Sequence, residues 1–166
     1  MDTWREVILR AYGSRVDAEG TSSKPAFYPP CAVGEIEEAE ACLKVSLPAD
    51  LRSLLLESDG VMDLLSVDGQ VFFESLWLIW PIEMMRKENL HARESAMQDH
   101  AELGIGDTLF FASAGTDGIL FGCPVSPSEV PDCPVVAWYS MEGYLVLLAG
   151  SLSEFIEGWL ANRITV

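Results

Sequence analysis

Four carboxylates and one tryptophan are the residues best suited to recognise a partner: Asp59, Asp63, Trp80, Glu83 and Asp117. Carboxylates attract basic groups, and tryptophan is the side chain that most often anchors a binding interface. We expect Trp80 to be partly exposed because it stands at a predicted strand end, immediately before a proline. The competing interpretation is that this tryptophan fills the core, as most tryptophans do. The spacing therefore predicts a partner-binding surface built from these five residues.

The sequence gives little indication of a metal site or of a catalytic nucleophile. His91 and His100 are the two histidines, and no cysteine stands near either one to complete a zinc site. No G-x-S-x-G sequence presents an activated serine. We therefore predict no catalytic residue, no metal and no cofactor.

Two acidic or glycine-containing segments resemble ligand loops only superficially. Asp59, Asp63 and Asp68 do not follow the calcium-loop pattern, because apolar residues occupy intervening ligand positions. The segment 115–118 is acidic and leads into an apolar run, whereas a phosphate-binding loop carries a lysine and opens a helix. Turn aspartates and a hairpin explain these segments better.

Paired carboxylates could also act as a general acid and a general base. Glu37 with Glu38, and Glu83 with Glu88, are such pairs. This chemistry requires a cleft that shifts one pKa, and a sequence does not reveal a cleft. An acidic-cleft hydrolase remains a remote alternative.

The four cysteines, Cys31, Cys42, Cys123 and Cys133, form no C-x-x-C pair. The N-terminus lacks the basic and apolar regions of a secretory signal. We therefore expect a cytoplasmic protein with reduced thiols. Two disulfides are the alternative, and they would require an oxidising compartment.

The charge balance indicates the kind of partner. Asp and Glu number 26 against 10 for Lys and Arg, which gives a net charge of -16. Such a chain repels nucleic acids and anionic membranes and attracts basic proteins. The alternative is that acidity only keeps the protein in solution.

Length and composition favour one folded domain spanning 1–166. A chain of 166 residues that is 49% hydrophobic is too apolar to remain disordered, despite its charge. No apolar run approaches the roughly 20 residues that span a bilayer.

Helices are predicted in the first third of the chain. Thr3 and Glu6 form a capping box before an apolar stripe that ends near Gly13. Residues 14–30 are predicted to be an irregular loop because they are rich in Gly, Ser and Pro. Amphipathic helices follow over 34–43 and from Pro48 to about residue 58, where the Asp59-Gly60 pair ends the second one.

Strands dominate the rest of the chain, with one helical segment between them and one at the end. β-Branched and aromatic runs predict strands at 70–73, 76–80, 109–112, 119–121, 135–139 and 144–149. Residues 82–98 contain at least one helical segment, and a helix capped by Ser151 and Glu154 closes the chain. This order predicts an α+β fold with a mainly antiparallel central sheet and helices packed on one face.

The succession of motifs resembles the SUKH superfamily. The N-terminal part of the resemblance lies in two helices, and the C-terminal part lies in a strand-turn-strand region and a last helix. The matching positions are Ile36, Glu40, Leu47-Pro48, Leu51, Leu54, Leu55, Asp59-Gly60, Trp80-Pro81-Ile82-Glu83, Gly115-Thr116-Asp117-Gly118, Val136-Ala137-Trp138 and 151–160. The resemblance makes 33–160 the family core and 1–30 an N-terminal extension. Lys44 and Asp59 depart from the usual family residues.

This resemblance implies a protein-binding role without catalysis. Bacterial members are typically immunity proteins that neutralise a polymorphic or contact-dependent toxin, often a nuclease, and fungal members regulate cell-wall synthesis. Our leading hypothesis is an immunity protein whose acidic surface meets a basic toxin domain. A regulatory scaffold of the same fold is the alternative.

Overall fold

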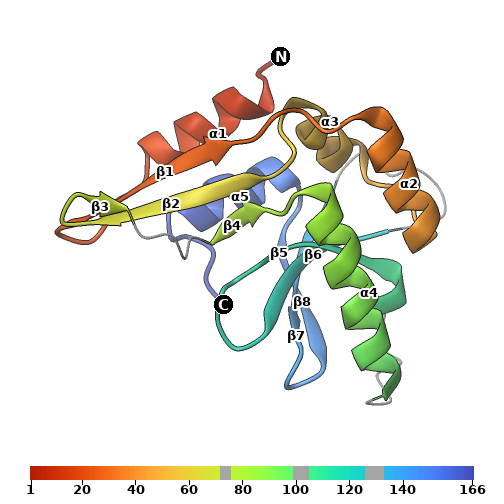
Figure 1. Cartoon of the computed structure of the whole chain (residues 1–166). Coiled ribbons are helices and arrows are strands. Elements are labelled where there is room, and N and C mark those ends of the chain that lie inside the picture. Colours follow the sequence, from red (N-terminus) through yellow and green to blue (C-terminus); the bar gives the residue numbers. More distant parts are fainter. Residues whose placement is uncertain (72–75, 99–104, 126–132) are drawn as a thin grey trace.

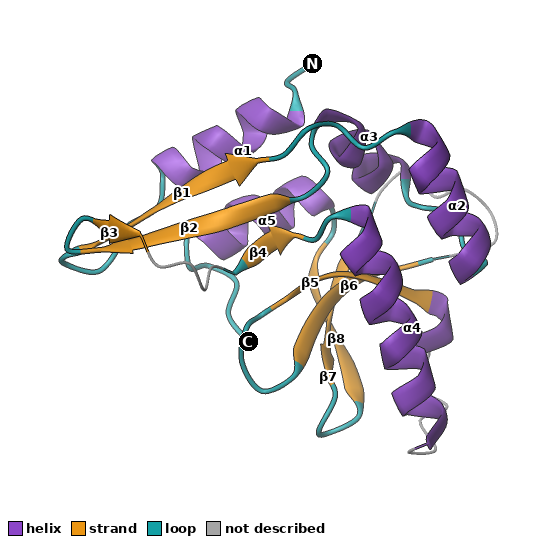
Figure 2. Cartoon of the chain, in the orientation of Figure 1, coloured by secondary structure: helices purple, strands orange, loops and turns teal. Residues whose placement is uncertain are grey.

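The computed structural model describes residues 1–71, 76–98, 105–125 and 133–166. Within these residues the chain forms helices and antiparallel sheets, with runs of consecutive strands, which confirms the α+β class (Figures 1 and 2). No helix in these ranges is long and apolar enough to cross a membrane. The helices are α1 (Trp4–Gly13), α2 (Val33–Leu43), α3 (Ala49–Glu57), α4 (Ile82–Gln98) and α5 (Leu152–Leu160). The strands are β1 (Thr21–Phe27), β2 (Val61–Val67), β3 (Gln70–Val71), β4 (Trp77–Ile79), β5 (Thr108–Ser113), β6 (Ile119–Pro124), β7 (Val135–Tyr139) and β8 (Tyr144–Ala149).

The strands form two four-stranded sheets instead of the single central sheet expected. Sheet A has the order β1-β2-β3, with β4 also paired to β2, and sheet B has the order β5-β6-β7-β8. β4 lies beside β5, and the backbone N–H of Trp80 donates to the Phe111 carbonyl at 2.8 Å. The two sheets therefore meet at the end of β4.

The core lies between α5, α1 and the inner faces of the sheets. The Phe155 ring of α5 packs against Phe111 and Phe121 of sheet B, with ring centroids 5.9 and 4.9 Å away. α1 packs against α5, α3 and β1. Ile8 of α1 and Leu55 of α3 are fully buried. The predicted apolar stripes of these helices therefore face the core.

α4 covers the open edge of β5 and packs along α2. The Asn89 side chain, 1% exposed, accepts a hydrogen bond from the Phe110 N–H at 2.8 Å and donates to the Phe110 carbonyl at 2.7 Å. An amide side chain thus pairs the backbone of β5 at Phe110, next to the bond that Trp80 makes at Phe111.

Both predicted helix starts have their hydroxyl caps. Thr3 and Glu6 form the full capping box at α1. At α5 the Ser151 hydroxyl accepts from the Glu154 N–H, but the Glu154 carboxylate accepts from the Gly150 N–H at 2.8 Å and so caps one residue earlier than expected.

Two predictions for the N-terminal half are wrong. The segment 14–30 is not an irregular loop throughout, because β1 runs through it and pairs with β2 from Thr21↔Val67 to Phe27↔Val61. β2 itself was missed. The intrinsic strand signal of β1 is weak, since it is polar and contains Pro25, and the strand is held by pairing with its neighbour. α3 ends at Glu57 with Ser58 extended, so Gly60, with φ +89°, does not cap it.

The expectation of four reduced thiols is also wrong. Cys123 and Cys133 form a disulfide that links the end of β6 to the segment before β7, with Cα atoms 5.5 Å apart. Cys31 is a buried free thiol and Cys42 is an exposed one.

Candidate functional site

A shallow hollow of about 130 Å³ lies between the first turns of α2 and α4. We call it the acidic hollow because three glutamates and one arginine supply its charged groups. Its lining is Glu35, Glu38, Ala39, Ile82, Glu83 and Arg86.

The packing of α2 against α4 creates this hollow. Ala39 and Ile82 are buried and form its apolar floor, while the three glutamates are exposed. The Glu35 carboxylate accepts from the Ala32 N–H at 2.9 Å at the start of α2. Acidic residues are favoured in a first helical turn because the helix dipole is positive there. The same local preference thus places negative charge on both walls.

Asp59 adjoins the hollow from the connection between α3 and β2. Its Oδ1 accepts from the Ile82 N–H at 2.7 Å, so it caps α4 although it lies 23 positions earlier in the chain. Burial raises the pKa of Asp59, the bond from Ile82 opposes that rise, and the charge of Glu35 adds to it. Asp59 therefore brings a partly buried carboxyl group next to the exposed glutamates.

The Cys31 thiol lies beside these carboxyl groups and is 4% exposed. Its Sγ contacts a Glu35 carboxylate oxygen at 3.6 Å. Burial, followed by the charges of Asp59 and Glu35, raises the pKa of Cys31 to about 12. The thiol is therefore protonated at neutral pH and is not a nucleophile.

Glu83 on the α4 wall is bound by neighbouring cations. Arg86 donates to its carboxylate at 3.0 and 2.7 Å, and the Lys87 ammonium lies 3.7 Å away. The hydrogen bond from Arg86 lowers the pKa of Glu83 and raises that of Arg86. Exposed ion pairs of this kind contribute little to stability, so a partner can replace Arg86 at small cost.

The structure brings two of the five predicted site residues together. Asp59 and Glu83 both lie at the start of α4. Asp63 is elsewhere, on β2, where its carboxylate is 17% exposed and pairs with Arg15 at 3.1 Å. Asp117 is exposed in the turn between β5 and β6 with φ 52°.

The expectation that Trp80 is partly exposed is wrong. Trp80 is 5% exposed and lies where the two sheets meet, because its backbone N–H donates to the backbone carbonyl of Phe111. The sequence could not reveal this position, since the strand that buries it lies about thirty residues later. Its side chain belongs to the core.

Glu35, Glu38 and Arg86 are site residues that sequence reasoning missed. The one sequence feature that could have indicated them is the presence of a glutamate, Glu35 or Glu83, in the first turn of each helix. That signal does not say which two helix starts lie side by side.

The arrangement suits recognition of a positively charged group. Two walls of carboxylates over an apolar floor can hold a guanidinium or an ammonium side chain. In the described part of the chain, no three metal-ligating side chains are grouped for a metal ion. His91 is exposed on α4, and His100 lies outside the described residues.

Comparison with known families gives a match over most of the chain. A family model described as SMI1 / KNR4 family (SUKH-1) matches residues 30–158. No curated protein matches the chain. The match covers both helices of the acidic hollow, sheet B, every strand of sheet A except β1, and most of α5.

Proposed function

The chain belongs to the SMI1/KNR4 (SUKH-1) family, and from this premise we propose that it is a non-catalytic immunity protein that neutralises a cognate bacterial toxin domain. The observation that carries the proposal is the acidic hollow, where Glu35, Glu38 and Glu83 face solvent on a chain of net charge -16. A basic toxin domain, such as a nuclease, is the matching partner.

The charge distribution supports this choice of partner. A nuclease carries a basic groove for its anionic substrate, and an acidic surface can occupy that groove in place of nucleic acid. Long-range attraction raises association rates by roughly 10–10³-fold at low salt. Fast association is useful when a toxin must be captured before it acts.

The local chemistry favours binding over hydrolysis. The raised pKa of Asp59 has a structural cause, because its carboxyl group is partly buried while capping α4 at Ile82. Cys31 is protonated and buried. The hollow is shallow, whereas an acid–base pair needs a cleft that excludes water.

Co-expression with a toxin domain tests the proposal. The domain to test is any C-terminal toxin domain of a large secreted protein that a neighbouring gene is found to encode. Wild-type protein should restore growth of cells that express this domain and should bind it in purified form. Failure of both results with every neighbouring toxin domain would refute the immunity role.

A matched pair of variants tests the site itself. The triple variant Glu35→Gln, Glu38→Gln, Glu83→Gln should weaken toxin binding by roughly 100-fold or more. The control variant Glu37→Gln, Glu94→Gln, Glu142→Gln removes the same charge from exposed positions outside the hollow. Equal losses in both variants would show that net charge, and not this hollow, determines binding.

Ionic strength provides a second test of the electrostatic mechanism. The association rate with the toxin domain should fall steeply between 50 and about 500 mM NaCl, because salt screens attraction between exposed charges. A rate that does not change with salt would contradict the mechanism.

A regulatory role, the alternative that membership of this family implies, is the second candidate. In that case a cytoplasmic regulatory partner would replace the toxin at the same surface. A gene neighbourhood without any secreted toxin protein would favour this candidate.

A further inference from the structure

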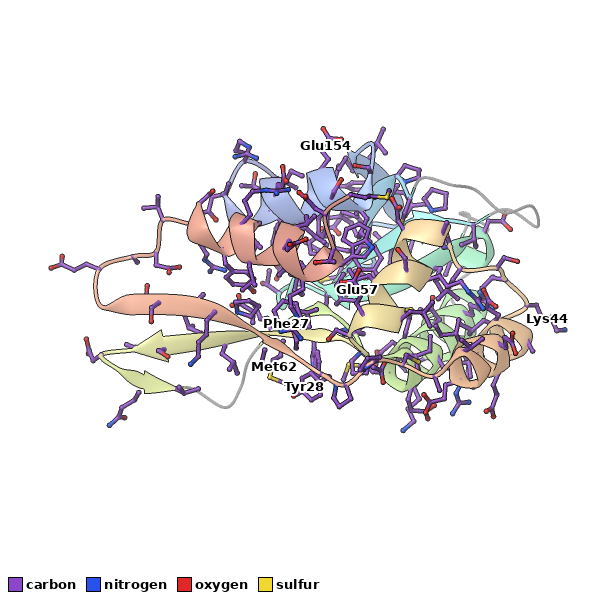
Figure 3. The ribbon with its side chains drawn as sticks, turned by 90° about the horizontal axis from the view of Figure 1, so that it is seen from above. Phe27, Tyr28, Lys44, Glu57, Met62 and Glu154 are labelled. Carbon is purple, nitrogen blue, oxygen red and sulfur yellow. A yellow bond between two sulfur atoms is a disulfide. The ribbon has the colours of Figure 1, made fainter. Side chains whose placement is uncertain are left out.

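Sheet A has one face packed on α1 and one face left open by the described helices. The pairs Phe27↔Val61 and Pro25↔Asp63 lie on the packed side. Because side chains alternate along a strand, the pairs Ala26↔Met62 and Lys24↔Leu64 point the other way. Figure 3 shows Phe27 toward α1 and places Met62 and Tyr28 on the side of the strands away from it.

This open face carries an apolar and aromatic surface, with the exposed Lys24 four residues before Tyr28 on the same side. Met62 also pairs with Trp77 across the sheet, and the Trp77 ring lies 5.2 Å from the Tyr28 ring. Tyr28 is 39% exposed, and Met62, Leu64 and Trp77 are half-buried. We call these residues the sheet A platform: Ala26, Tyr28, Met62, Leu64 and Trp77.

The platform adjoins the acidic hollow through Gly60. A Cβ added at Gly60 would lie 3.0 Å from the Trp77 ring and 2.8 Å from the Pro81 nitrogen. Asp59, the preceding residue, donates its N–H to the Pro29 carbonyl and accepts from Ile82. The residue after Tyr28 and the first residue of α4 therefore both contact Asp59. The half-buried Asp59 thus connects the Tyr28 end of the platform to the first turn of α4, where the acidic hollow begins.

We propose that this composite surface binds an extended, cationic segment of a protein partner, with an apolar side chain on the Tyr28–Trp77 pair and an arginine or lysine in the acidic hollow. Buried aromatic anchors surrounded by charged groups are typical of binding hot spots. The proposal rests on the proposed function for its basic protein partner. It adds the location of the apolar contact.

Charge complementarity selects this occupant over the others. A second copy of the chain would bring another net charge of -16 against the same carboxylates. Nucleic acid and anionic lipid are repelled in the same way. The positive side chains of a cationic segment pair with the carboxylates of the hollow, while its apolar side chains cover the platform.

A peptide titration tests the surface without knowledge of the natural partner. The probe is a 12-residue peptide of alternating arginine and leucine, and the matched probe alternates arginine and serine. Methyl NMR of methionine-labelled protein should show a shift of Met62 and no shift of Met141, which is 79% exposed in the turn before β8. The serine peptide should bind at least about tenfold more weakly.

Variants complete this experiment. Tyr28→Ala removes the aromatic ring and should weaken leucine-peptide binding by about tenfold. The variant should still fold, because the hydrogen bonds between the Ser58 hydroxyl and the Tyr28 backbone remain in place. Leu147→Ala, at a site on β8 that is 68% exposed, should leave binding unchanged. Circular dichroism confirms that both variants fold. Equal shifts of Met62 and Met141, or equal affinity for both peptides, would overturn the proposal.

Toxin rescue separates this inference from the proposed function. If wild-type protein rescues cells and Tyr28→Ala rescues them equally well, the proposed role of the platform in binding is refuted and the immunity role stands. If wild-type protein rescues no cells but the leucine peptide shifts Met62, the surface stands and the immunity role fails.

Discussion

Asp59 shows how one residue can serve both the fold and the candidate site. Its carboxyl group caps α4 at Ile82 and contributes negative charge beside the acidic hollow. A carboxylate that is partly buried beside Glu35 would be less stable than one in water. The bond from Ile82 recovers part of that cost.

Asp59→Asn and Asp59→Ala separate the cap from the charge. Because the pKa of Asp59 is raised in the folded chain, the folded state binds more protons than the unfolded state above the ordinary carboxyl range. The free energy of unfolding therefore decreases as pH rises through that window. Asp59→Asn keeps an acceptor for Ile82 and should lose this pH dependence without loss of stability at pH 7.

Asp59→Ala removes the acceptor and should be about 1 kcal/mol less stable than Asp59→Asn. Urea unfolding at pH 7 and at about pH 4 measures both effects. Equal stabilities for the alanine and asparagine variants would show that the cap contributes nothing.

The cysteines make a second prediction at the residue scale. A thiol reagent should modify Cys42 promptly in the native protein and Cys31 only slowly, because Cys42 is exposed and Cys31 is buried. After unfolding without a reductant, two thiols should react, since Cys123 and Cys133 are paired. Four reactive thiols would contradict the disulfide.

At the scale of elements, the buried side chain of Asn89 joins α4 to β5. Asn89→Ala should lower the free energy of unfolding by about 2–4 kcal/mol, because it leaves the N–H and carbonyl of Phe110 unpaired in the core. His91→Ala, at an exposed position on the same helix, should change it by less than about 0.5 kcal/mol. Chemical unfolding of both variants provides the comparison. Similar values would mean that water replaces the amide.

A comparison of the two sheets shows why some strands were predicted from the sequence and others were not. β7 and β8 of sheet B begin and end at the predicted residues, since each is an uninterrupted apolar run that includes valine and aromatic residues and the two are joined by a turn. β1 lacks that pattern, and it is ordered by seven residue pairs with β2. Pairing between distant segments overrides local preference here.

At the scale of the whole molecule, net charge opposes compactness. The chain carries 26 acidic and 10 basic residues, so its carboxylates repel one another more when it is folded. Raising NaCl from 50 to about 500 mM at pH 7 should raise Tm by roughly 2–4 °C.

The control variant Glu37→Gln, Glu94→Gln, Glu142→Gln should gain less from salt, since it has less repulsion to screen. Differential scanning calorimetry measures both proteins. A Tm that falls with salt would mean that ion pairs such as Arg15 with Asp63 dominate over repulsion.

The sequence by itself determined the α+β class, most helix boundaries, the hydroxyl caps of α1 and α5 and the acidic character of the chain. These features depend on local periodicity, turn residues and composition, which are visible within a few positions. It also indicated Asp59 and Glu83 as residues of the candidate site.

Only the tertiary structure decided which of these charges meet and which side chains are exposed. Asp59 reaches Ile82 across 23 positions, and Trp80 is buried by a strand about thirty residues later. Packing of α2 on α4 brings Glu35 next to Glu83, and the open side of sheet A leaves Tyr28 at the surface. Contacts between segments so far apart depend on the whole fold, and no local pattern encodes them.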